Sequence, residues 1–153
     1  MMKRFLLLFL IASFNVSAAE QAITQWVYNT LERAQANLDK GNIEAAERIY
    51  YDYANDTWSS RSYDHFVLLR TYAYFLISYD RNEEALKYLR QASLKRDMPP
   101  YDIFELNFTL GQVYYVNGDR ENAKKTLLKW VEIGEKNKLD LKPEGYAILA
   151  TIY

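Results

Sequence analysis

Apolar residues recur along the chain at the intervals of three and four that are typical of helices with one buried face. Between these stretches stand glycine, asparagine, aspartate and proline, which end one helix and begin the next. The pattern predicts three helix pairs and one further helix. The expected ranges are 21–39 with 43–55, 63–79 with 82–96, 101–117 with 120–138, and a last helix from residue 143.

Two predicted turns place a glycine before an asparagine or aspartate, at Gly41-Asn42 and Gly118-Asp119. Glycine adopts the left-handed conformation that ends a helix, and the following side chain caps the next helix. The middle turn has Asp80 in the glycine position, so we expect it to be the most strained, with Asn82 as its cap. Proline fits the first turn of a helix, and two prolines are expected to begin helices: Pro100 and Pro143.

A small residue returns at intervals of 39, 38 and 39 residues, at Ala34, Ala73, Gly111 and Ala150. A second register follows the first three members by 12 residues, at Ala46, Ala85 and Ala123. Two phased registers indicate a repeat in which paired helices approach closely at the small residues. The sequence therefore predicts an all-α, right-handed superhelical solenoid of three repeats plus a terminal helix.

The third repeat contains Leu110-Gly111-x-x-Tyr114, followed by Gly118-Asp119, Ala123 and Leu127, and it resembles the tetratricopeptide repeat. That family places a bulky residue three positions before the Leu-Gly pair, where this chain has Asn107. The period exceeds the usual 34 residues by four or five, which we assign to longer second helices and loops. Other helical repeats of longer period are the alternative.

A narrower resemblance extends over the mature chain and is carried by residues 31–35, 88–92, 98–100, 107–114 and 143–150. In order and content these segments resemble periplasmic tetratricopeptide proteins encoded beside TonB, ExbB and ExbD energy-transduction genes of gammaproteobacteria. The resemblance implies a protein-binding scaffold whose partner is a TonB-system component. The alternatives are an adaptor in cell-envelope assembly, or the N-terminal repeat segment of a longer protein whose enzymatic part is absent.

Residues 1–19 have the features of a cleavable secretory signal: the basic pair Lys3-Arg4, an apolar run over 5–12, and the small-residue stretch 16–19. Cleavage after Ala18 or Ala19 would leave residues 20–153 as one repeat domain in the periplasm. An uncleaved anchor is the alternative, but Asn15 closes the apolar run well short of the roughly 20 residues that span a membrane. We therefore expect no membrane insertion after cleavage.

Charge and composition argue against nucleic-acid binding and catalysis. Removal of residues 1–19, which include two basic residues and no acid, would leave 17 basic and 20 acidic residues, a net charge of −3. The chain has no cysteine and a single histidine, His65, so the sequence predicts no metal site and no thiol nucleophile. The adjacent acids Glu83-Glu84 are explained by the helix dipole. We expect no cofactor and no enzymatic activity.

The first helices of stacked repeats line a concave face, which predicts a peptide-binding groove. The residues selected by their position relative to the small-residue register are Leu31, Gln35, Arg70, Tyr74, Phe108, Gln112 and Tyr115. Tyrosine and arginine are the side chains that dominate binding hot spots. The alternative is that these residues cap the inner core.

The last predicted helix has no second helix to cover it. Its residues Ile148, Ile152 and Tyr153 are apolar, and solenoids normally end in a polar cap. The sequence therefore predicts self-association through the C-terminal helix.

Overall fold

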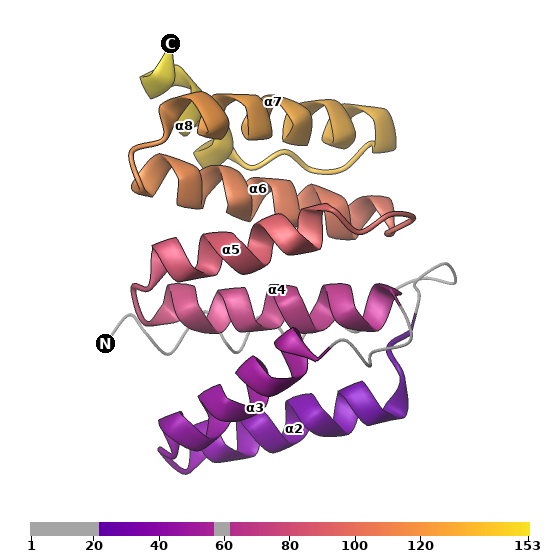
Figure 1. Cartoon of the computed structure of the whole chain (residues 1–153). Coiled ribbons are helices and arrows are strands. Elements are labelled where there is room, and N and C mark those ends of the chain that lie inside the picture. The colour runs from indigo at the N-terminus through magenta and orange to yellow at the C-terminus, as the bar shows by residue number, and fades with distance from the viewer. Residues whose placement is uncertain (1–21, 57–61) are drawn as a thin grey trace. The chain divides into compact units, whose positions relative to one another are not determined.

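The computed structural model describes residues 22–56 and 62–153, and every regular element in these residues is an α-helix (Figure 1). The predicted all-α fold is confirmed. The predicted signal, residues 1–19, lies outside the described residues and stays a prediction. The helices are α2 (Gln25–Asp39), α3 (Ile43–Asn55), α4 (Ser62–Ser78), α5 (Asn82–Ser93), α6 (Pro100–Val116), α7 (Arg120–Asn137) and α8 (Pro143–Ile152).

The chain divides into two compact units, residues 1–81 and residues 82–153. In the first unit α3 packs against both α2 and α4. In the second unit α6 packs against α5 and α7, and α8 packs against α6 and α7. Packing between consecutive helices is the arrangement of helical repeats. The predicted right-handed superhelix stays a prediction.

All members of the two small-residue registers except Ala150 lie in the core, as the sequence predicts. Alanines at 34, 46, 73, 85 and 123 are completely buried, and Gly111 is buried with them. Ala150 is exposed, because α8 turns Gly145 and Leu149 toward its own unit instead. Ile148 also packs against that core, so this residue is a core contact rather than the open apolar surface the sequence suggested.

Helices α6 and α7 of the second unit approach each other closely at Gly111. A Cβ atom added at Gly111 would lie 2.6 Å from Cγ of Leu127 and 2.7 Å from its Cδ2. A side chain at position 111 would therefore require Leu127 to shift. The core built around this contact consists of Phe104, Phe108, Leu127, Trp130 and Leu149.

The turn glycines adopt the predicted left-handed conformation, with φ of 78° at Gly41 and 81° at Gly118. Asp80 takes the same place in the middle turn with φ of 59°. Because this conformation costs a residue with a side chain more than glycine, the middle turn carries the strain predicted for it. Pro100 and Pro143 begin α6 and α8, as expected.

Two predicted helix caps are wrong and one is confirmed. Asn42 directly precedes α3, but its side chain makes no cap hydrogen bond. Asn82 is itself the first residue of α5, so it cannot cap that helix. Asp119 caps α7 by accepting a hydrogen bond from the amide of Asn122 at 3.1 Å. Hydrogen bonds from Asn122 lower the pKa of Asp119.

The N-terminus of α2 is fixed by residues that the sequence did not single out. The helix begins at Gln25 rather than at residue 21, and Thr24 caps it by accepting from the amide of Val27 at 3.4 Å. The amide of Thr24 donates to Oδ1 of Asp64, a buried carboxylate of α4, at 3.0 Å. This bond links the start of α2 to α4 across the first unit.

We expect Gly111→Leu to lower the free energy of unfolding by about 1–3 kcal/mol, the usual cost of overpacking, because the new side chain meets Leu127. Urea denaturation measures the difference. The matched control is Ala45→Leu on the exposed side of α3. Equal midpoints for the two variants would contradict the close approach of α6 and α7.

Candidate protein-binding surfaces

Aromatic rings in contact form a row in the first unit. The ring of Tyr50 on α3 lies 5.3 Å from Phe75 and 6.5 Å from Tyr72, both on α4. Tyr79 continues the row at 4.8 Å from Phe75. Tyr50, Tyr72 and Phe75 are buried, whereas Tyr79 is exposed. The row therefore runs from the core of the unit to its surface.

Burial changes the acidity of Tyr50. Desolvation of the phenol, with smaller contributions from Asp39 and Tyr79, raises its pKa to about 12 from the usual 10.0. Burial disfavours the charged phenolate, and the negative charge of Asp39 opposes it further. Tyr50 is therefore a neutral packing residue at physiological pH.

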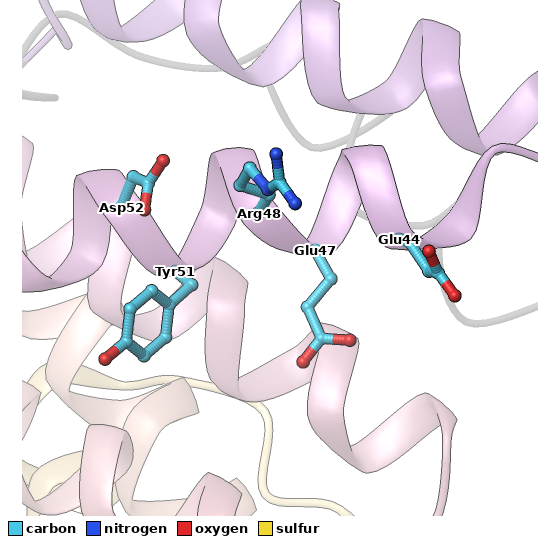
Figure 2. Close-up of a pocket in the computed structure, with 5 residues that line it drawn as sticks. All are labelled: Glu44, Glu47, Arg48, Tyr51 and Asp52. Atoms are coloured by element: carbon cyan, nitrogen blue, oxygen red, sulfur yellow. The ribbon is translucent and has the colours of Figure 1, made fainter.

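A shallow surface hollow of about 450 Å³ lies along α3 and is lined by Glu44, Glu47, Arg48, Tyr51 and Asp52 (Figure 2). These positions recur at three- and four-residue intervals, so they share one broad face of the helix. The lining contains three carboxylates and one guanidinium, so its side chains carry a net negative charge. The side chain of Tyr51 is half exposed and meets the ring of Tyr72 edge-on at 6.2 Å.

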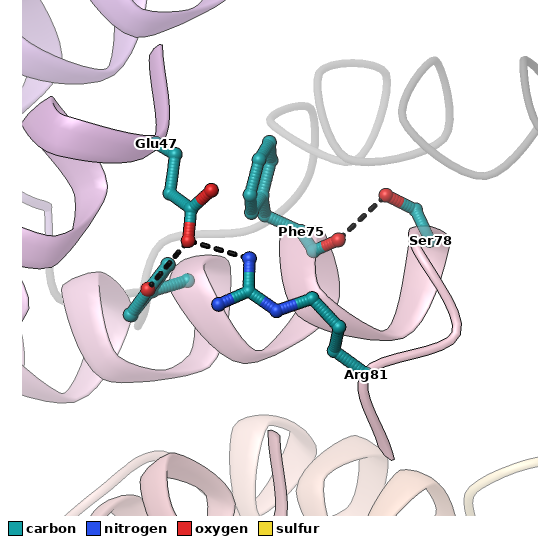
Figure 3. A network of polar contacts seen from close by, with 5 residues as sticks. Glu47, Phe75, Ser78 and Arg81 are labelled. Carbon is teal, nitrogen blue, oxygen red and sulfur yellow. Dashed lines mark hydrogen bonds and ion pairs between the residues drawn. The ribbon is translucent and has the colours of Figure 1, made fainter. Parts of the chain in front are cut away.

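Glu47 is held in place by two residues of the first unit (Figure 3). Its Oε1 accepts from Nη1 of Arg81 at 2.5 Å and from the hydroxyl of Tyr72 at 3.3 Å. Arg81 directly follows the left-handed Asp80, so the turn after α4 positions the guanidinium. The carboxylate of Glu47 is thus pre-oriented at the edge of the hollow. No sequence pattern indicates this pair, because 34 residues separate its members.

A second aromatic group lies at the surface between α2 and α3. The ring of Trp26 packs against Tyr53 at 5.0 Å in an edge-on geometry. Arg33 donates from Nη2 to the hydroxyl of Tyr53 at 3.1 Å and lies over its ring. Trp26 is 45% exposed, so this group presents an aromatic face to the surroundings of the unit.

The seven predicted groove residues are distributed over both units. Leu31, Gln35, Arg70 and Tyr74 belong to the first, and Phe108, Gln112 and Tyr115 belong to the second. Six of them are partly exposed, as a surface role requires. Phe108 is only 7% exposed and packs 5.1 Å from Trp130, so it is a core residue. The groove itself stays a prediction.

The side of α6 that carries the predicted groove residues is bordered by α8 and the segment before it. Lys142 pairs with Glu105 at 2.8 Å and lies 4.6 Å from the ring of Phe108. Near the other end of α6, Thr151 donates to the hydroxyl of Tyr115 at 3.3 Å. These contacts fix the position of α8 beside α6.

The residues described, 22–56 and 62–153, contain no group of three or more histidine, cysteine, aspartate or glutamate side chains arranged to hold a metal ion. His65 uses its Nε2 for a hydrogen bond with the carbonyl of Ala54 at 3.0 Å. Among the same residues no helix has the length and apolar character needed to cross a membrane.

Comparison with known proteins shows a partial similarity to a much longer protein. No family model matches the chain. The chain is 30% identical over 118 residues to pre-mRNA-splicing factor 6 of Saccharomyces cerevisiae. The match covers 70% of this chain and 11% of the yeast protein. The chain thus resembles a small part of a much longer protein.

The raised pKa of Tyr50 predicts how stability depends on pH. Because the unfolded phenol ionises near pH 10 and the folded one near pH 12, stability is fully present below pH 10 and is lost as the pH rises toward 12. We expect Tyr50→Phe to flatten this loss in urea denaturation between pH 9 and pH 11.5, roughly the range of that titration. Tyr51→Phe, on the exposed side of α3, is the control for removal of a tyrosine hydroxyl from the surface of the same helix. An unchanged slope in Tyr50→Phe would argue against a buried phenol.

The Glu47–Arg81 pair is about one third exposed on each side, so water screens much of its attraction. A double-mutant cycle with Glu47→Gln and Arg81→Met should give a coupling energy of about 0.5–1 kcal/mol that falls with added salt. Glu47→Gln keeps an acceptor for Tyr72, which limits the cycle to the ion pair. Additive effects of the two changes would show that the pair contributes nothing.

Proposed function

We propose that this protein is a protein-interaction scaffold of the tetratricopeptide type. The observation that supports it most is the face of α3, where the half-exposed ring of Tyr51 stands beside the pre-oriented carboxylate of Glu47. Tyrosine is one of the residue types that are enriched in binding hot spots. A carboxylate that is already held loses little conformational freedom when a partner binds.

The similarity to the yeast splicing factor supports the scaffold role. It covers too little of that protein to assign this chain to the same pathway. The match covers 11% of the yeast protein, so the role of that protein in splicing is not transferred to this chain. The feature carried over is the helical repeat as a surface for other proteins.

We further propose that the scaffold works in the periplasm beside a TonB-type energy-transduction system. The support is the signal-like composition of residues 1–19 and the segment order that resembles periplasmic proteins of that kind. The alternatives are an adaptor in cell-envelope assembly and the repeat segment of a longer enzyme. The partner that is captured, and the mass of the native product, distinguish the three.

Crosslinking in intact cells tests the proposal. The tagged full chain should be recovered from the periplasmic fraction, with residues 1–19 removed, and crosslinked to a TonB-system component. Changing the α3 face with Glu44→Ala and Tyr51→Ala should abolish the crosslink while leaving the helical circular dichroism unchanged, because both side chains are exposed.

Two further variants locate the surface. Arg70→Ala with Tyr74→Ala and Tyr115→Ala changes the predicted groove, and Lys136→Ala on the exposed side of α7 is the matched control. A crosslink lost only in the groove variant would move the binding surface from α3 to the groove. A crosslink kept in every folded variant, or a product that stays in the cytoplasm, would contradict the proposal.

A further inference from the structure

Three side chains form a stripe along the open face of α3. Glu44, Glu47 and Tyr51 are spaced three and four residues apart, which places them on one side of the helix. Figure 2 shows the side chains of Glu47 and Tyr51 extending from the same side of α3, while Arg48 and Asp52 point to a different side. The stripe borders the hollow of about 450 Å³, so a side chain of another protein has room to lie against it.

The carboxylate of Glu47 keeps one oxygen for a donor from outside the unit. Its hydrogen bonds from Nη1 of Arg81 and from the hydroxyl of Tyr72 both end on Oε1 (Figure 3). Among the described residues, none donates to Oε2. A carboxylate accepts hydrogen bonds at both oxygens, and the side chain of Glu47 is 29% exposed. The second oxygen is therefore accessible and already oriented.

The ring of Tyr51 lies one helical turn from this carboxylate. Residues four apart on a helix have Cβ atoms about 5–6 Å from each other. Tyr51 is 50% exposed, and the ring of Tyr72 supports it edge-on, with 6.2 Å between the ring centroids. A cation within about 6 Å of a ring centroid is attracted to the face of the ring. An accessible ring and a fixed carboxylate at this spacing can therefore hold one cation between them.

The charges around the stripe are not balanced. The described residues of the hollow and its border include three carboxylates and two guanidinium groups, on Glu44, Glu47, Asp52, Arg48 and Arg81. Arg81 is paired with Glu47. Arg48 has one of the other two carboxylates four residues to either side, so a single guanidinium serves both. Three negative and two positive charges leave a net charge of −1, which one cation from a partner would balance.

We infer that the stripe of Glu44, Glu47 and Tyr51 binds an arginine side chain of a partner protein. The inference rests on the proposed scaffold role of the α3 face and adds the chemistry of the partner. A guanidinium is planar, so it can stack on the ring of Tyr51 while its N–H groups donate to Oε2 of Glu47. The carboxylate of Glu44, one turn before Glu47, offsets the repulsion from Arg81. A lysine ammonium is more strongly hydrated and has no plane to stack, so arginine is favoured over lysine.

A titration followed by nuclear magnetic resonance on the purified, isotope-labelled full chain tests the inference. The probe is N-acetyl-arginine amide, which carries one positive charge and no carboxylate. We expect saturable shifts of the backbone amide signals within residues 44–52, and weaker binding of N-acetyl-lysine amide. Shifts that spread over the surface without saturating, or equal affinity for the two probes, overturn the inference.

Matched variants separate this site from a general attraction of cations to an acidic chain. Tyr51→Ala changes no charge at neutral pH and should raise the Kd about two- to fivefold, the usual size of an exposed cation–π contact. Tyr51→Phe keeps the ring and should bind like the parent. Glu44→Gln should also weaken binding. Its control is Glu121→Gln, an exposed glutamate that is the second residue of α7 as Glu44 is of α3, and it should leave the Kd unchanged.

Far-ultraviolet circular dichroism checks that each variant is folded. A folded Tyr51→Ala variant that binds like the parent, or equal effects of Glu44→Gln and Glu121→Gln, would contradict the inference.

The crosslinking in cells reports on the scaffold role itself, so the two proposals can fail separately. A crosslink that depends on the α3 face, in a chain that does not bind the arginine probe, would keep the scaffold role and reject arginine as the recognised side chain. A chain that binds the probe at α3 but is crosslinked to no protein would contradict the scaffold role alone.

Discussion

The close approach of consecutive helices at small residues is the constraint on which the rest of this structure depends. At Gly111 the side chain of Leu127 occupies the space in which any Cβ would lie. That contact fixes the distance between α6 and α7. One turn further along α7, Trp130 is completely buried and packs against both Phe104 and Phe108. The indole in turn lies on Gly145, so the same packing decides where α8 can sit.

The first unit fills the equivalent space with a larger side chain. Tyr50 follows Ala46 by four residues, as Leu127 follows Ala123 in the second unit. A tyrosine there extends the core into a row of rings with Tyr72 and Phe75, and the hydroxyl of Tyr72 then needs a polar partner. Glu47 supplies it and is anchored by Arg81. Core packing thereby fixes a carboxylate at the surface, where it borders the hollow on α3.

The face of α3 that remains open combines a tyrosine ring with acidic side chains, which suits a partner with complementary positive charge. It is the part of the helix that is left at the surface after the inner stripe of α3 has been buried, because a helix in a solenoid packs only against its neighbours in the stack.

The sequence by itself determined the helices, the helix-pair register and the left-handed turns, because these follow from local backbone preference and from a small-residue period that repeats along the chain. It did not determine the cap of α5, because a one-residue shift in helix onset makes Asn82 the first helical residue. It also did not determine that the side chain of Asn42 makes no cap hydrogen bond, although α3 begins where the sequence predicts. Only the tertiary structure placed Phe108 and Ile148 in the core, since a helix position alone does not tell which neighbour covers it. It also brought Glu47 to Arg81, because a pair so distant along the chain leaves no periodic signal and exists only once α3 packs on α4.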